Sequence, residues 1–139
     1  MTRSLYAFIG LAVALSLGHH VDHVLRGATG WPLADTANPF TYSLLVYPAI
    51  VAGLALSRRG RAGPRFWLLL TSAGAVFVLA VHVGPAADDS PAGIAAGYGS
   101  PVAAAAALAW LGLFIAALLG LSLYELRLWR GRGGRPIAE

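Results

Sequence analysis

Four long apolar runs dominate the chain, and stretches rich in glycine, proline or charged residues separate them. The runs cover residues 4–24, 41–57, 66–84 and 101–126. A helix needs roughly 17–25 residues to cross the apolar core of a bilayer, and each run is long enough to do so. Pro48 lies inside the second run and predicts a kink there, because proline lacks the backbone N–H of a regular helix. The pattern predicts an all-α fold, a four-helix transmembrane bundle that forms one integral membrane domain over residues 1–139.

Composition agrees with a membrane protein rather than a soluble one. Hydrophobic residues make up 58% of the chain and charged residues 12%, whereas a typical soluble domain carries about 25% charged residues. The chain contains no cysteine. This excludes disulfide bonds, thiolate metal sites and haem attached through cysteine.

The basic residues predict how the bundle is oriented in the membrane. All ten are arginines, and nine of them fall near the N-terminus, between the second and third runs, or near the C-terminus. These nine are Arg3, Arg58, Arg59, Arg61, Arg65, Arg127, Arg130, Arg132 and Arg135. Because arginine-rich loops stay on the cytoplasmic side, we expect both termini to be cytoplasmic in the plasma (inner) membrane. Contact with anionic membrane lipids explains the positive charge, so we expect no nucleic-acid partner.

Small residues recur every four positions in two of the runs. They are Gly10, Ala14 and Gly18 in the first run and Gly112, Ala116 and Gly120 in the fourth. Small residues at this spacing let helices approach closely in lipid. We expect these two faces to pack inside the bundle, to join copies of the chain in a homo-oligomer, or to attach it to a larger membrane complex.

Polar residues cluster where the first run ends, in the stretch SLGHHVDHVLRG. His19, His20, Asp22 and His23 lie within five positions. On a helix, His19 and His23 differ by about 40° of rotation and about 6 Å of rise, so both rings can reach one ligand. His82 ends the third run, which is parallel to the first, so we expect it at a similar depth. Because polar groups facing lipid are costly, all of them should face the bundle interior or the outer interface.

The first interpretation of this cluster is a transition-metal site for zinc, copper or iron. His19, His23 and His82 are the predicted ligands, because imidazole binds all three metals. Asp22 either completes the coordination or orients a ligand, and His20 is a further candidate for cofactor binding. Three protein ligands with an open position suit metal-assisted chemistry. The sequence does not decide whether the chain is an enzyme; if it is, a lipid-like substrate at the outer leaflet is expected.

Two other interpretations stay open. A b-type haem would lie between the first and third helices, with His82 and either His19 or His23 as its axial ligands. No histidine falls near the predicted inner face of the membrane, so a second haem is not expected. Alternatively, no cofactor is bound: Asp22 pairs with Arg26, four residues later on the same helix, and the chain is an accessory or structural subunit of a membrane complex.

Other polar residues carry weaker signals. Glu125 lies near the inner end of the fourth run, where we expect an arginine partner or contact with Trp129, with a proton-relay role as the less favoured alternative. Asp88 and Asp89 could bind a cation, but acidic pairs in loops are usually solvated. Tyr47 lies within the second run, and its hydroxyl group needs a partner there, so it could line a pocket.

Overall fold

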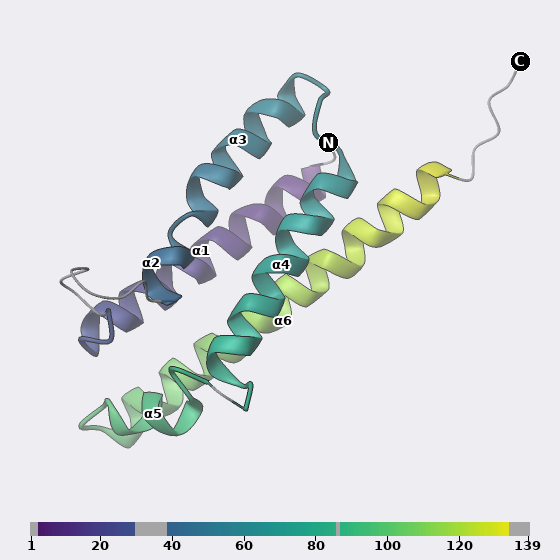
Figure 1. Cartoon of the computed structure of the whole chain (residues 1–139). Coiled ribbons are helices and arrows are strands. Elements are labelled where there is room, and N and C mark those ends of the chain that lie inside the picture. The colour runs from purple at the N-terminus through teal and green to yellow at the C-terminus, as the bar shows by residue number, and fades with distance from the viewer. Residues whose placement is uncertain (1–2, 30–38, 86, 134–139) are drawn as a thin grey trace, which may run out of the picture.

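A computed structural model of the chain describes residues 3–29, 39–85 and 87–133. The described parts contain helices and connecting segments but no β-strand. Figure 1 shows four long helices together with two short ones, α2 and α5. They are α1 (Arg3–Leu25), α2 (Pro39–Ser43), α3 (Val46–Arg58), α4 (Pro64–His82), α5 (Pro91–Ala96) and α6 (Pro101–Gly133). The prediction of an all-helical fold is confirmed.

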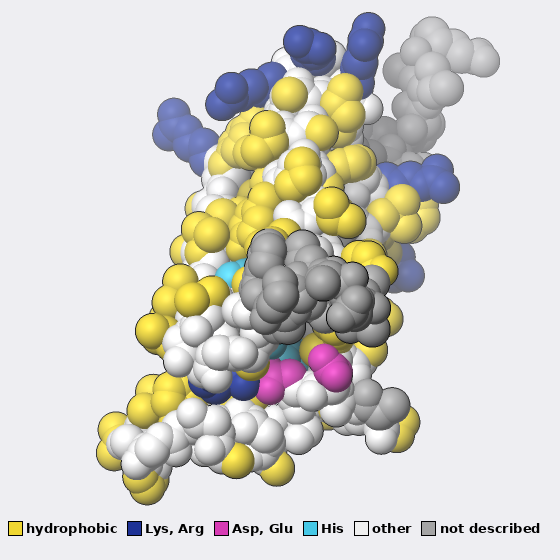
Figure 2. Space-filling view, turned by 60° about the vertical axis from the view of Figure 1, so that its left-hand side comes forward, with side chains coloured by type: hydrophobic (Ala, Val, Ile, Leu, Met, Phe, Trp, Pro, Cys, Tyr) yellow, Lys and Arg dark blue, Asp and Glu magenta, His cyan; other side chains and the backbone are white. Residues whose placement is uncertain are grey.

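Four helical segments are long and apolar enough to cross a membrane. They are Arg3–Leu25, Pro39–Arg58, Pro64–His82 and Pro101–Gly131. Figure 2 shows hydrophobic side chains over the middle of the molecule and a group of basic side chains at the end that holds the N-terminus. This distribution is consistent with a membrane protein. The cytoplasmic location of the termini stays a prediction, and Arg135, one of the arginines behind it, lies outside the described residues.

The second predicted helix is interrupted, so that α2 and α3 are separated by a turn at Leu44 and Leu45. Pro48 has no N–H group with which to bond the Leu44 carbonyl oxygen, four residues earlier. That oxygen instead accepts a hydrogen bond from the Tyr47 backbone N–H at 3.2 Å. The predicted irregularity is therefore present, but it lies one turn before the proline. α6 also differs from its prediction, because it continues past residue 126 to Gly133.

The packing is centred on α6, which packs against both α4 and α1. One buried cluster lies toward the α5 end of the bundle and contains Leu15, Ala75, Val78, Ile94, Leu111, Phe114 and Leu118. A second lies toward the N-terminal end and contains Leu5, Ile9, Trp67 and Leu121. α3 is held more loosely, since Gly53 is its only buried residue. This loose packing leaves space between α3 and the other helices.

Glycine allows close helix contact at one position of the two small-residue faces. A Cβ atom on Gly18 would overlap the indole ring of Trp110 in α6. The corresponding positions at Gly10, Gly112 and Gly120 have no atom of the chain within 4 Å. The face in α1 thus contributes to packing inside the bundle through Gly18. Association of the chain with other copies or partners stays a prediction.

We expect Gly18→Val to destabilise the bundle, because its side chain would displace Trp110. Overpacking of this kind typically costs about 1–3 kcal/mol. Thermal unfolding in mild detergent, followed by circular dichroism, measures the effect. Gly10→Val is the matched control, since its side chain would meet open space. Equal unfolding temperatures for the two variants would contradict the α1–α6 contact.

Candidate metal centre

Three buried histidines meet where α1 and α4 end. His19 and His23 come from α1 and His82 from the last position of α4, and each is at most 7% exposed. The Nε2 atom of His19 lies 3.1 Å from Nε2 of His82 and 3.2 Å from Nε2 of His23. Each residue offers a ligand nitrogen within 4.8 Å of the other two. A tetrahedral zinc ion with Zn–N distances of about 2.0–2.1 Å would hold its nitrogens roughly 3.3 Å apart, so the group can hold one ion.

Backbone carbonyl groups set the tautomers of two of these rings. Nδ1 of His23 donates to the Ala28 carbonyl oxygen at 3.0 Å, and Nδ1 of His82 donates to the Asp89 carbonyl oxygen at 2.7 Å. A carbonyl oxygen only accepts, so each Nδ1 carries a proton, and in the neutral ring Nε2 presents a lone pair. Metal-binding histidines usually have such a partner on their second nitrogen.

The three Nε2 atoms do not have enough protons to satisfy one another. With His23 and His82 neutral, only Nε2 of His19 can donate, and it can donate to only one of its two neighbours. The Nε2 lone pair of the other neighbour would then be buried without a donor, and burial of an unsatisfied polar group is costly. A metal ion accepts all three lone pairs at once. The donor set and its buried surroundings therefore fit a metal ion.

The structure places Asp22, the fourth predicted ligand, in a different contact. Its carboxylate accepts hydrogen bonds from Arg26 Nε at 3.0 Å and Nη2 at 2.8 Å. The hydroxyl group of Tyr98 also donates to it. Asp22 thus binds Arg26 and Tyr98, and it does not belong to the group of residues that could hold an ion. The ion pair with Arg26 that the third interpretation, without a cofactor, expected is present.

Asp89 is the acidic residue next to the histidines, although its position in a loop led us to expect a solvated side chain. Its Oδ2 atom lies 3.6 Å from Nε2 of His23 and 3.6 Å from Nδ1 of His82. Both carboxylate oxygens also accept hydrogen bonds from Arg26, at 2.9 and 2.6 Å. Burial alone would raise the pKa of Asp89, but the bonds and the charge of Arg26 outweigh burial and lower it. Asp89 therefore carries a negative charge beside the three rings.

Arg26 joins the end of α1 to the segment that follows α4. Its side chain is 3% exposed and pairs with both Asp22 and Asp89. Burial works against its charge, but the two carboxylates raise the pKa of Arg26 above its ordinary value. Since the carbonyl group of Asp89 orients His82, Arg26 helps to position this ligand. The trio of Asp22, Arg26 and Asp89 is referred to below as the arginine clamp.

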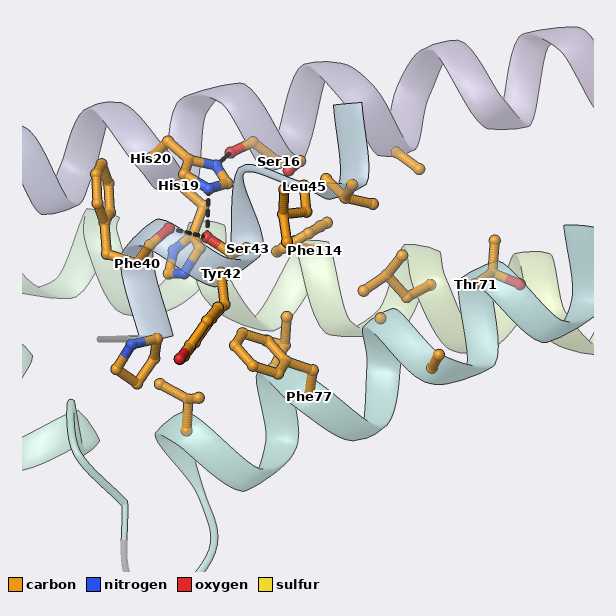
Figure 3. Close-up of a pocket in the computed structure, with 18 of the residues that line it drawn as sticks. Ser16, His19, His20, Phe40, Tyr42, Ser43, Leu45, Thr71, Phe77 and Phe114 are labelled. Carbon is orange, nitrogen blue, oxygen red and sulfur yellow. Dashed lines mark hydrogen bonds between the residues drawn. The ribbon is translucent and has the colours of Figure 1, made fainter. Parts of the chain in front are cut away.

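His20 belongs to a separate polar network that faces α2 and α3 (Figure 3). Nδ1 of His20 donates a hydrogen bond to the Ser16 carbonyl oxygen at 2.7 Å, and the Tyr47 hydroxyl oxygen lies 2.9 Å from the same nitrogen. Its Nε2 lies 2.7 Å from the hydroxyl oxygen of Ser43. Both ring nitrogens are thus engaged away from the three-histidine group, and Tyr47 has the partner that its position requires.

A cavity of about 580 Å³ extends from the histidines into the bundle. Trp67 and His82 both line it, and they lie 15 residues apart in α4, about 22 Å along the helix axis. Polar groups gather at the histidine end, and most of the remaining lining is apolar, including Phe77 and Leu118 (Figure 3). A volume of this size is typical of a small-molecule site. The histidines therefore lie at one end of an apolar cavity.

The chain matches no known family model, and comparison with curated proteins and with solved structures also finds no match. Its function is therefore inferred from the site itself.

We expect Arg26→Gln to destabilise the protein strongly. Removal of one partner from a buried ion pair typically costs about 3–5 kcal/mol, because the remaining charge stays buried. The double variant Arg26→Gln/Asp89→Asn should lose less than the sum of the two single variants, since it removes both partners of one contact. Denaturant unfolding of the four proteins in detergent measures this coupling. Strictly additive losses would show that Arg26 does not act through Asp89.

Proposed function

We propose that this chain is an integral membrane protein with a transition-metal centre bound by His19, His23 and His82. The observation that carries the proposal is the meeting of three buried Nε2 atoms that have too few protons to hydrogen-bond one another. Nε2 of His19 lies 3.1 Å from that of His82 and 3.2 Å from that of His23. Hydrogen bonds to backbone carbonyl groups already direct two of these atoms toward a common point. Neutral imidazole ligands without a thiolate suit zinc, copper or iron.

Three protein ligands would leave one coordination position for a molecule from the cavity. This arrangement is typical of catalytic rather than structural zinc sites. A metal ion here would act as a Lewis acid on a polar group of the bound molecule. Asp89 contributes negative charge beside the ligands, and the arginine clamp holds the His82 ring in position.

The substrate we propose is a lipid-like molecule that enters the cavity from the membrane. The cavity lies among the membrane-length helices, and its lining is mostly apolar away from the histidines. A molecule with one polar head and an apolar body would place the head at the metal and the body along α4. With the arginine-rich end on the cytoplasmic side, the metal centre faces outward in the plasma membrane.

A haem between the same histidines fits this geometry less well. Two axial imidazoles bind iron from opposite faces of a porphyrin, which at bonds of about 2 Å places their nitrogens roughly 4 Å apart. His19 and His82 have their nitrogens 3.1 Å apart, with the nitrogen of His23 beside them. Three converging nitrogens favour a single ion over a flat macrocycle.

Metal analysis of the protein purified in mild detergent tests the proposal. We expect about one zinc, copper or iron ion per chain in the wild type, and at least a tenfold lower content in His23→Ala and His82→Ala. His20→Ala is the matched control, since this neighbouring histidine belongs to another network, and it should keep its metal.

Two results would overturn the metal proposal. The first is a wild-type protein that binds none of the three metals after reconstitution. The second is a His20→Ala variant that loses as much metal as His82→Ala. A visible spectrum of the same sample distinguishes the alternative, because a Soret band would indicate haem.

A further inference from the structure

Glu125 is a fully buried acid in the half of the bundle opposite the histidines. It is 0% exposed, and it lies within the membrane-length part of α6. Its Oε2 atom is 2.8 Å from the hydroxyl oxygen of Thr71 in α4, and its Oε1 atom has no hydrogen-bond partner. The ion pair with an arginine that we expected for Glu125 does not form among the described residues. An unpaired acid inside a membrane bundle is costly and usually functional.

No cation in the described parts of the chain compensates for a charge on Glu125. The basic side chains described toward this end of the bundle are all exposed: Arg3, Arg58, Arg59, Arg61, Arg65, Arg127 and Arg130. The three histidines lie at the other end of the cavity: His82 is 11 residues beyond Thr71 in α4, about 16 Å along the helix axis. A carboxylate here would therefore be buried without a counter-ion, which is strongly unfavourable.

The hydrogen bonds around Thr71 are complete if Glu125 carries a proton. The Thr71 hydroxyl lies 2.9 Å from the Trp67 carbonyl oxygen, which can only accept, so Thr71 donates its single proton there. Ser122 donates to the Thr71 oxygen at 3.0 Å. The remaining lone pair of Thr71 can accept a proton from Oε2 of Glu125. If Thr71 instead donated to Glu125, a buried carboxylate would have one hydrogen bond and a free second oxygen.

Thr71 also connects this acid to the cavity. It contacts Glu125 and is itself part of the cavity lining, together with Trp67 and Leu121. Figure 3 shows Thr71 on α4, well separated from the histidine end. Thr71 thus contacts the buried acid and also lines the space that a bound molecule would occupy.

We propose that Glu125 is a proton-binding site that serves the cavity through Thr71. Glu125 is a carboxylic acid in the folded bundle. The Thr71 hydroxyl can turn its proton from the Trp67 carbonyl oxygen to a proton acceptor in the cavity, such as water. When this acceptor takes the proton and becomes hydronium, Thr71 receives the proton of Glu125, and Glu125 becomes a carboxylate. The reverse transfer restores the acid. The cavity then has a proton donor and acceptor at one end and the histidines at the other.

Infrared spectroscopy of the purified protein tests the protonation state. At about pH 6 an ordinary glutamate, with a pKa of about 4.3, is almost fully ionised. We expect the wild type to show the carbonyl stretch of a protonated carboxyl group at this pH, and Glu125→Gln to lack it. The chain has only six acidic residues, so the difference between the two spectra isolates this group. A spectrum with no such difference would overturn the proposal.

Transfer into heavy water tests the route. The carboxyl band should shift as its proton exchanges, and Thr71→Val should keep the band but slow the shift at least tenfold. Thr71→Ser restores the hydroxyl and should restore the wild-type rate, while Ser72→Ala is the control on the same helix. Wild-type exchange in Thr71→Val would show that the proton does not pass through Thr71. None of these measurements depends on a bound metal, so their outcome is separate from that of the metal proposal.

Discussion

The contact between His19 and His82 is the constraint around which the α5 end of this bundle is organised. It joins the first and third membrane-length segments through two buried nitrogens 3.1 Å apart, in a region where polar groups must find partners within the protein. The carbonyl groups of Ala28 and Asp89 orient the neighbouring rings, and Arg26 holds the segment that carries Asp89. Because the two carbonyl groups accept hydrogen bonds from Nδ1 of His23 and His82, the Nε2 atoms of these neutral rings carry no proton. A metal ion would bind the lone pairs that these Nε2 atoms present.

The molecule places two polar groups at opposite ends of one apolar cavity. The histidines lie at the end near α5, and Glu125 with Thr71 lies toward the N-terminal end. The cavity between them exists because α3 packs loosely, with only Gly53 buried, while α4 and α6 pack tightly along their lengths. The proposed amphiphilic substrate would place its polar head at the histidine end of this cavity, and Thr71 and Glu125 would supply the proposed proton donor and acceptor at the other end.

Much of the fold follows from the sequence, because membrane-length apolar runs leave few alternatives to helices. The i,i+4 spacing of His19 and His23 and the parallel course of the third helix also predicted that His82 would join them. The contact of Asp22 with Tyr98 was not predictable, since the two residues lie 76 positions apart. The contact of Glu125 with Thr71 was not predictable for the same reason, because the two residues lie 54 positions apart. Contacts of this kind depend on how the helices rotate against one another, which local patterns do not encode.

The central claim is that three imidazole nitrogens share one metal ion. X-ray absorption at the metal edge of the loaded protein measures this most directly. We expect three imidazole ligands with metal–nitrogen distances of about 2.0–2.1 Å if the ion is zinc. A first shell made mainly of oxygen, without the outer scattering typical of imidazole rings, would contradict the assignment of His19, His23 and His82 as the metal centre.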